Sequence, residues 1–179
     1  MITKLAENFA REKHNEQFRK FEGEPYFNHV KKVAKIIKEN KKSSHLNELI
    51  AAGLLHDTLE NTNTSEKELM ENFGELITSL VKELTTDKNE SESVGKKEYL
   101  AKKLSDPEKV SSWGLVIKLA DRLDNVSDLN NGAKEFSDKY IDETRHILKT
   151  LEERRKLTET QKKLIGKIKE KIDNSKSVD

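Results

Sequence analysis

The sequence predicts an all-α protein of about eight or nine helices. Apolar residues recur every three or four positions along most of its 179 residues, as they do on one face of an α-helix. Glycine (7) and proline (2) are scarce, whereas Lys, Glu and Leu are common, and this balance favours helices. No segment alternates apolar and polar residues convincingly enough to predict a β-strand.

The apolar stripes in the first half of the chain predict five helices. Their approximate positions are residues 2–10, 30–37, 46–61, a short segment around 69, and 76–84. Gly23 and Pro25 separate the first two helices, because both residue types interrupt helices. Ser65 and Glu68 have the spacing of a capping box, so a helix is expected to begin there.

In the second half, the polar segment 85–97 is predicted to be a mobile loop. Four helices are expected after it, at residues 99–104, 106–129, 140–157 and 164–172. Pro107 is expected in the first turn of the second of these, where proline is tolerated. That helix contains the most apolar stretch of the chain, residues 113–129.

The length fits a single domain over 1–179, with a core at about 2–155 and a Lys-rich amphipathic helix at 156–179 that could also serve as an oligomer contact. The net charge of +1 provides no overall field that would attract nucleic acid or a membrane. Because cysteine is absent, disulfides and thiolate metal sites are excluded. The N-terminal residues lack an apolar signal core and no run could span a bilayer, so a cytoplasmic location is expected.

Polar groups follow an apolar run in "GLLHDTLENT", residues 53–62. On a helix, His56 and Glu60 would share one face, and Asp57 and Asn61 would share a neighbouring one. A carboxylate at the edge of a core needs a partner, because an unpaired buried charge is costly. A divalent cation is one such partner.

Two further residues extend this pattern. His29 heads the second helix at its apolar edge, and Asp121 follows Leu119-Ala120, with Asn125 one turn later. Two imidazoles and two carboxylates suit Mn, Fe or Zn, and such an ion activates water and polarises a phosphoryl group. Each residue alone has an ordinary structural explanation, such as a packed histidine or an Asp121 paired with a basic neighbour. The prediction depends on their occurrence together.

His29, His56-Asp57 and Asp121, in this order, resemble the metal-dependent HD-domain phosphohydrolases, which are helical bundles. The match is closer to the hydrolase domain of RelA/SpoT-type alarmone enzymes, over most of residues 6–150. It is carried by "HNEQFRKFEGEPYFNHVKKVA", "AAGLLHDTLENTNTSEKELMENFGELITSLVKELT", "KLADRLDNVSDL" and "YIDETRHIL". The length resembles a stand-alone small alarmone hydrolase of the Mesh type. The resemblance implies Mn²⁺-dependent removal of the 3′-pyrophosphate of ppGpp or pppGpp, giving GDP or GTP and pyrophosphate, although another divalent metal could serve.

The resemblance also implies roles for individual residues. The metal ligands would be His29, His56, Asp57 and Asp121. The residues around the nucleotide would be Arg19, Lys20, Lys88, Lys97 and Asn125, with Lys96 as a further candidate; the loop aligns less clearly at Lys96 and Lys97. In a chain this rich in lysine, a loop lysine is more often simply solvated. His14 is expected to be structural, and His45 and His146 are expected at the surface without specific partners.

Glu60 and Asn61 are the expected catalytic residues, and the second departs from the family, which usually has Asp there. An amide can hydrogen-bond but cannot accept a proton as a base. Glu60 would then remain as the base, with slower turnover. Two alternatives keep the HD fold: hydrolysis of another nucleotide (ppApp, NADPH or a deoxynucleotide), or nucleotide binding without catalysis. A third is a helical interaction module with a chance HD pair.

Overall fold

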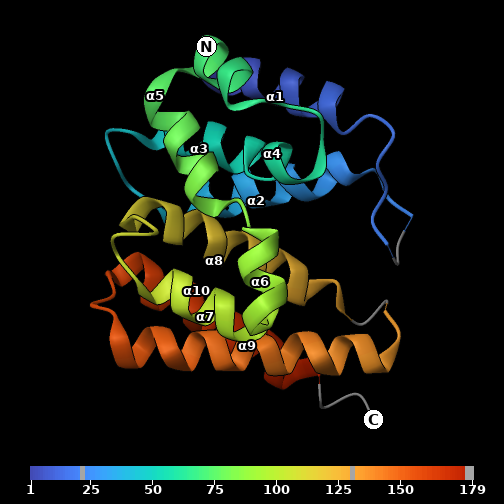
Figure 1. Ribbon diagram of the computed structural model, residues 1–179, viewed down its shortest axis with the longest axis vertical. Helices are drawn as coiled ribbons and strands as arrows, with labels where there is room; N and C mark the ends of the chain where they lie inside the picture. Colours follow the sequence, from blue (N-terminus) through green and yellow to red (C-terminus); the bar gives the residue numbers. More distant parts are fainter. Residues whose placement is uncertain (21–22, 130–131, 176–179) are drawn as a thin grey trace. The chain divides into compact units, whose positions relative to one another are not determined.

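The computed structural model describes residues 1–20, 23–129 and 132–175, and these residues form ten helices and one isolated β-bridge, between Phe18 and Pro25. The all-α prediction is therefore confirmed for the described chain (Figure 1). The helices are α1 Ile2–Lys13, α2 Tyr26–Asn40, α3 Leu46–Leu55, α4 Thr58–Asn61, α5 Glu66–Leu84, α6 Lys88–Val94, α7 Lys96–Ser105, α8 Ser112–Ser127, α9 Lys134–Arg154 and α10 Glu159–Ser175. They fall into two compact units, Met1–Thr85 and Thr86–Asp179.

The first unit is built around α3, which packs against α1, α2 and α5 (Figure 1). The sequence of α3, LNELIAAGLL, is apolar on nearly every side, so a central position satisfies it. Gly53 lets α2 approach closely, because a Cβ atom at this position would lie 2.5 Å from Ile37 Cδ1. Helix α3 ends at Leu55, and the single turn α4 begins at Thr58, after the two residues His56 and Asp57.

Helix α5 joins the two short helices expected around residue 69 and over 76–84. Gly74 interrupts it with φ 74°, a conformation that glycine adopts without steric cost, so the helix is kinked. The predicted helix start is confirmed, since Ser65 Oγ accepts a hydrogen bond from the Glu68 N–H at 3.1 Å. The Glu68 carboxylate pairs with Lys13 Nζ at 2.8 Å and thereby links α5 to α1.

The second unit is organised around α8, whose buried side chains pack against α10, while α7 packs against α9. The Lys-rich C-terminal helix contributes four apolar residues to this core, Leu164, Ile165, Ile168 and Ile172. None of the described helices is both long enough and apolar enough to cross a membrane.

Two expectations for the second half were wrong. Residues 88–94 form α6 rather than a loop, because the Asp87 side chain accepts from the Glu90 N–H at 3.0 Å and caps the helix. Gly95, with φ 86°, then makes the turn into α7. The long helix also does not begin at Pro107: Ser111 Oγ caps α8 by accepting from the Gly114 N–H at 3.0 Å, and residues 106–109 form a turn. Both errors came from unrecognised N-caps.

Candidate functional site

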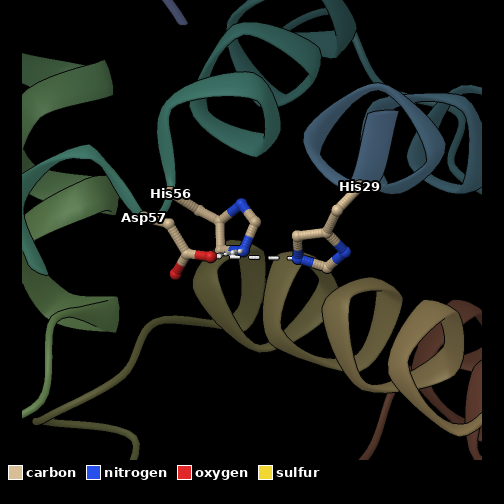
Figure 2. A group of neighbouring side chains, drawn as sticks. All are labelled: His29, His56 and Asp57. Carbon is tan, nitrogen blue, oxygen red and sulfur yellow. Dashed lines mark ion pairs between the residues drawn. The ribbon is translucent and has the colours of Figure 1, made fainter. Parts of the chain in front are cut away.

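His29, His56 and Asp57 gather in the first unit, where one ligand atom from each lies within 4.8 Å of the others (Figure 2). His29 comes from α2, His56 follows the last residue of α3, and Asp57 precedes the first residue of α4. The imidazoles are buried, and the Asp57 side chain is only 15% exposed. Two imidazoles and one carboxylate form a set that could hold a metal ion such as Mn, Fe or Zn.

The backbone contact of His56 determines where one of its ring hydrogens lies. Its Nδ1 lies 2.8 Å from the carbonyl oxygen of Gly53, and because a carbonyl can only accept, Nδ1 carries the hydrogen. The other ring nitrogen, Nε2, points toward Asp57 Oδ2 at 3.2 Å, and His29 Nε2 lies 3.8 Å from the same oxygen. A backbone acceptor on the far nitrogen is the arrangement typical of metal-binding histidines.

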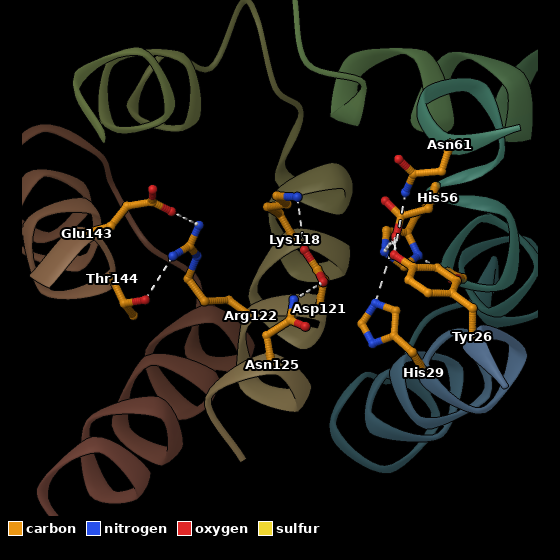
Figure 3. A network of polar contacts seen from close by, with 12 residues as sticks. Tyr26, His29, His56, Asn61, Lys118, Asp121, Arg122, Asn125, Glu143 and Thr144 are labelled. Atoms are coloured by element: carbon orange, nitrogen blue, oxygen red, sulfur yellow. Dashed lines mark hydrogen bonds and ion pairs between the residues drawn. The ribbon is translucent and has the colours of Figure 1, made fainter. Parts of the chain in front are cut away.

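Tyr26 and Asn61 border this cluster. The Tyr26 hydroxyl donates a hydrogen bond to Asp57 Oδ2 and accepts one from Asn61 Nδ2 at 3.4 Å (Figure 3). Glu60, on α4, is half-buried, whereas Asn61 at the end of that turn is exposed. The one-turn helix therefore carries both residues that the sequence predicted to be catalytic.

His14 is buried and does not belong to the ligand group. Its Nδ1 lies 2.7 Å from Gln17 Oε1, and Gln17 Nε2 donates to the backbone carbonyl of Asn61 at 2.6 Å. Burial lowers the pKa of His14 below its ordinary 6.5, with smaller opposing contributions from the Gln17 hydrogen bond and the Asp57 charge. His14 is thus a buried histidine that is linked through Gln17 to the backbone of Asn61.

Asp121 and Asn125 lie on α8 in the second unit. Asp121 is 5% exposed; its Oδ2 is 2.9 Å from Lys118 Nζ, and its Oδ1 accepts from Asn125 Nδ2 at 2.6 Å (Figure 3). The pairing with a basic neighbour is the structural explanation that the sequence had left open. The role of Asp121 as a fourth metal ligand stays a prediction.

The basic residues predicted to bind substrate lie in two regions. Arg19 and Lys20 lie in the turn between α1 and α2, where the Arg19 N–H donates to the Glu24 carbonyl at 2.7 Å. Lys88 and Lys96 are exposed at the starts of α6 and α7.

Lys97, one residue into α7, lies 2.8 Å from Asp142 Oδ2. Their hydrogen bond raises the pKa of Lys97 and lowers that of Asp142. Lys97 is therefore ion-paired in this structure rather than simply solvated.

The other two histidines differ from each other. His45 is exposed, as predicted, but the expectation that it has no partner was wrong, because its Nδ1 lies 3.9 Å from Glu48 Oε1. The expectation that His146 has no partner was wrong, because its Nε2 lies 2.9 Å from Glu98 Oε1.

A family model described as "HD domain" matches residues 6–157. The chain belongs to the HD-domain family. A zebrafish (Danio rerio) protein named guanosine-3′,5′-bis(diphosphate) 3′-pyrophosphohydrolase MESH1 is 39% identical over 124 residues, covering 69% of this chain and 66% of its own length. The MESH1 protein of Xenopus tropicalis is 36% identical over 140 residues, and the match covers 77% of this chain and 75% of that protein. A hydrolase of the same name without the MESH1 suffix, from Aquifex aeolicus, is 37% identical over 155 residues, although this chain covers only 21% of it.

A solved structure supports the same assignment. It is described as "A metazoan ortholog of SpoT hydrolyzes ppGpp and plays a role in starvation responses", and it aligns with a TM-score of 0.76 and 27% identity over 97% of this chain and 95% of that one. The predicted resemblance to HD-domain alarmone hydrolases is therefore confirmed.

Sequence reasoning missed two residues of this HD-domain site, Tyr26 and Gln17. Both lie within the quoted "HNEQFRKFEGEPYFNH" segment, but neither has a helical spacing to residues 56–61. Their contacts join positions 31 and 44 residues apart, so no local pattern could have indicated them.

Proposed function

We propose that this chain is a metal-dependent hydrolase that removes the 3′-pyrophosphate of ppGpp or pppGpp, giving GDP or GTP and pyrophosphate. The observation that carries the proposal is the buried group of His29, His56 and Asp57 in a chain that belongs to the HD-domain family. Relatives at 36–39% identity bear the name of this activity. The proposed partner is accordingly a small nucleotide.

The proposed ion is Mn²⁺, held by His29, His56, Asp57 and, from α8, Asp121. The hydrogen on His56 Nδ1 leaves Nε2 as the atom that would bind the metal, which fits a mixed nitrogen and oxygen set. When bound, such an ion lowers the pKa of a water molecule and polarises a phosphoryl oxygen.

Side chains of the protein supply the proposed base and the proposed contacts to the substrate. Glu60 is the proposed base, because its carboxylate can accept a proton, whereas the Asn61 amide can only hydrogen-bond. Arg19 offers a planar guanidinium that can stack on a purine, and Lys20 offers charge for phosphate oxygens. Lys88, Lys97 and Asn125 complete the proposed substrate contacts, with Lys97 exchanging its Asp142 partner for phosphate.

The test is incubation of the purified chain with ppGpp in the presence of Mn²⁺ or EDTA, followed by anion-exchange chromatography. GDP and pyrophosphate should form only with Mn²⁺. A panel containing ppApp, NADPH and deoxynucleoside triphosphates separates this activity from other HD phosphohydrolases. Binding of ppGpp without any product would instead favour a nucleotide-binding protein in which Asn61 has ended catalysis.

A further inference from the structure

Tyr26 connects the candidate metal ligand Asp57 with Asn61. Its hydroxyl donates to Asp57 Oδ2, the same oxygen that lies 3.2 Å from His56 Nε2. The Asn61 amide approaches the Tyr26 oxygen at 3.4 Å (Figure 3). A phenol has one proton, an ionised carboxylate has none, and an amide NH₂ can only donate. The direction is therefore fixed: Asn61 donates to Tyr26, and Tyr26 donates to Asp57.

Packing holds the Tyr26 ring in place independently of these polar contacts. The ring contacts two histidines, with centroid separations of 5.0 Å to His14 and 5.4 Å to His29. Its backbone N–H donates to the Gln17 carbonyl at 2.8 Å. Removing only the hydroxyl should therefore leave the ring where it is.

Asn61 is also held by its backbone. Its carbonyl accepts from Gln17 Nε2 at 2.6 Å, and its N–H donates to the Asp57 carbonyl at 2.9 Å. Because Gln17 uses its NH₂ group here, its oxygen faces His14 and accepts from Nδ1 at 2.7 Å. The two backbone contacts fix residue 61 in place, so its side chain reaches Tyr26 from a supported position.

We propose that Tyr26 is a positioning residue of the metal site: its hydroxyl holds the Asp57 carboxylate toward the two imidazoles, and the Asn61 amide keeps the phenolic proton directed at Asp57. This inference rests on the proposed metal site. It gives the amide at position 61 a function, since a carboxylate there would accept the phenolic proton and compete with Asp57 for it. Hydrogen bonds of this kind orient metal ligands and tune their affinity.

The first test is Mn²⁺ affinity, measured from the electron paramagnetic resonance signal of the free aqua ion. Tyr26→Phe should weaken binding by about 10–100-fold, the usual effect of losing a partner of a metal ligand. Tyr99→Phe is the matched control, because Tyr99 is also buried and its hydroxyl is also hydrogen-bonded. That hydroxyl accepts from the Asp87 N–H at 2.9 Å, so its partner is a backbone group and not a proposed metal ligand. That variant should bind Mn²⁺ like the wild type. Thermal unfolding of the metal-free Tyr26→Phe variant should stay cooperative.

The second test is a double-mutant cycle with Asn61→Asp. The added carboxylate attracts the ion equally whether or not the hydroxyl is present, whereas its competition for the phenolic proton requires that hydroxyl. The effect of Asn61→Asp on Kd should therefore differ between the wild-type and Tyr26→Phe backgrounds by about twofold or more.

Two results would overturn the positioning role. One is a Tyr26→Phe variant that binds Mn²⁺ as tightly as wild type, and the other is an Asn61→Asp effect that is equal in both backgrounds. Neither affects the proposed function, provided that the wild type binds Mn²⁺. A wild-type chain that binds no Mn²⁺ would instead overturn the proposed metal site together with this inference.

Discussion

His56 Nε2 lies 3.2 Å from Asp57 Oδ2, although the hydrogen of the ring is committed to the Gly53 carbonyl through Nδ1. Without a second proton, the Nε2 lone pair would face a carboxylate oxygen. A positive charge at this point, either a proton on Nε2 or a metal ion bound by both atoms, would stabilise the arrangement. This relationship between adjacent residues makes metal binding the central property to test.

Removal of the His56 imidazole should abolish tight metal binding. His56→Gln loses the Nε2 ligand, so Mn²⁺ affinity should fall more than about 100-fold. This is a larger loss than the one expected on removing a residue that only hydrogen-bonds to a ligand. Calorimetric titration measures it. His45→Gln is the control, since His45 belongs to the same unit and its side chain is 47% exposed. Equal Mn²⁺ affinity in His56→Gln and wild type would exclude His56 as a ligand.

Glu60→Gln should lower ppGpp turnover by ~10²–10⁴, the usual cost of losing a general base. The variant keeps the size and polarity of the side chain, and Mn²⁺ affinity should change little. Steady-state kinetics with saturating Mn²⁺ measure the effect. Glu71→Gln, at a position whose side chain is 64% exposed, serves as the control. Unchanged turnover in Glu60→Gln would exclude it as the base.

Gly53→Ala should destabilise the first unit by about 1 kcal/mol. Its Cβ atom would meet Ile37 Cδ1 at 2.5 Å, and the cost of overpacking, ~1–3 kcal/mol, exceeds the helix-propensity gain of about 1 kcal/mol. Ile37→Val deletes that Cδ1 atom. In the Ile37→Val background, Gly53→Ala should therefore become neutral or stabilising. Urea denaturation measures both effects. If Gly53→Ala were equally destabilising in the Ile37→Val background, the close contact between residue 53 and Ile37 Cδ1 would be contradicted.

Breaking the buried Arg122–Glu143 pair should be costly. Arg122 donates to Glu143 Oε1 at 3.0 Å and to Thr144 Oγ1 at 2.8 Å, and both charged residues are buried (Figure 3). Glu143→Ala leaves a buried guanidinium unpaired, so the free energy of unfolding should fall by about 3–5 kcal/mol. The double replacement Arg122→Met with Glu143→Leu should cost less.

An exposed ion pair provides the comparison for that experiment. The side chains of Lys82 and Glu66 are 63% and 55% exposed, so Lys82→Met should cost less than about 1 kcal/mol. If Glu143→Ala cost no more than Lys82→Met, the buried pair would not stabilise the second unit.

His14 should make the stability of the metal-free protein depend on pH. Burial lowers its folded-state pKa below 6.5, so between these two values the unfolded state binds more protons and stability falls as pH decreases. His14→Asn retains a donor for Gln17 but does not titrate. Below pH 6.5, its free energy of unfolding should fall less steeply than that of wild type, by up to about 1.4 kcal/mol per pH unit. Urea denaturation in EDTA across pH 5–8 measures the slopes, and parallel curves would contradict the prediction.

Much of the fold was predictable because helical periodicity is local. The stripes of α1, α2, α3 and α8 are visible in the sequence, and the structure buries most of their residues, although Leu5 of α1 is 45% exposed. The prediction of a loop for the segment 85–97 was wrong because its helix, α6, has little apolar periodicity and depends on the Asp87 cap and the Gly95 turn. Capping involves one side chain and one backbone group, a weaker signal than a stripe.

For the site, the sequence by itself determined which residues could form a metal shell. His56 and Asp57 are adjacent in one short segment, and His29 and Asp121 fit the same family pattern. Only the tertiary structure decided how that shell is supported: Tyr26 reaches Asp57 across 31 residues, and Gln17 reaches Asn61 across 44. These contacts depend on how α1, α2 and α3 pack, and packing brings together residues that no local periodicity relates.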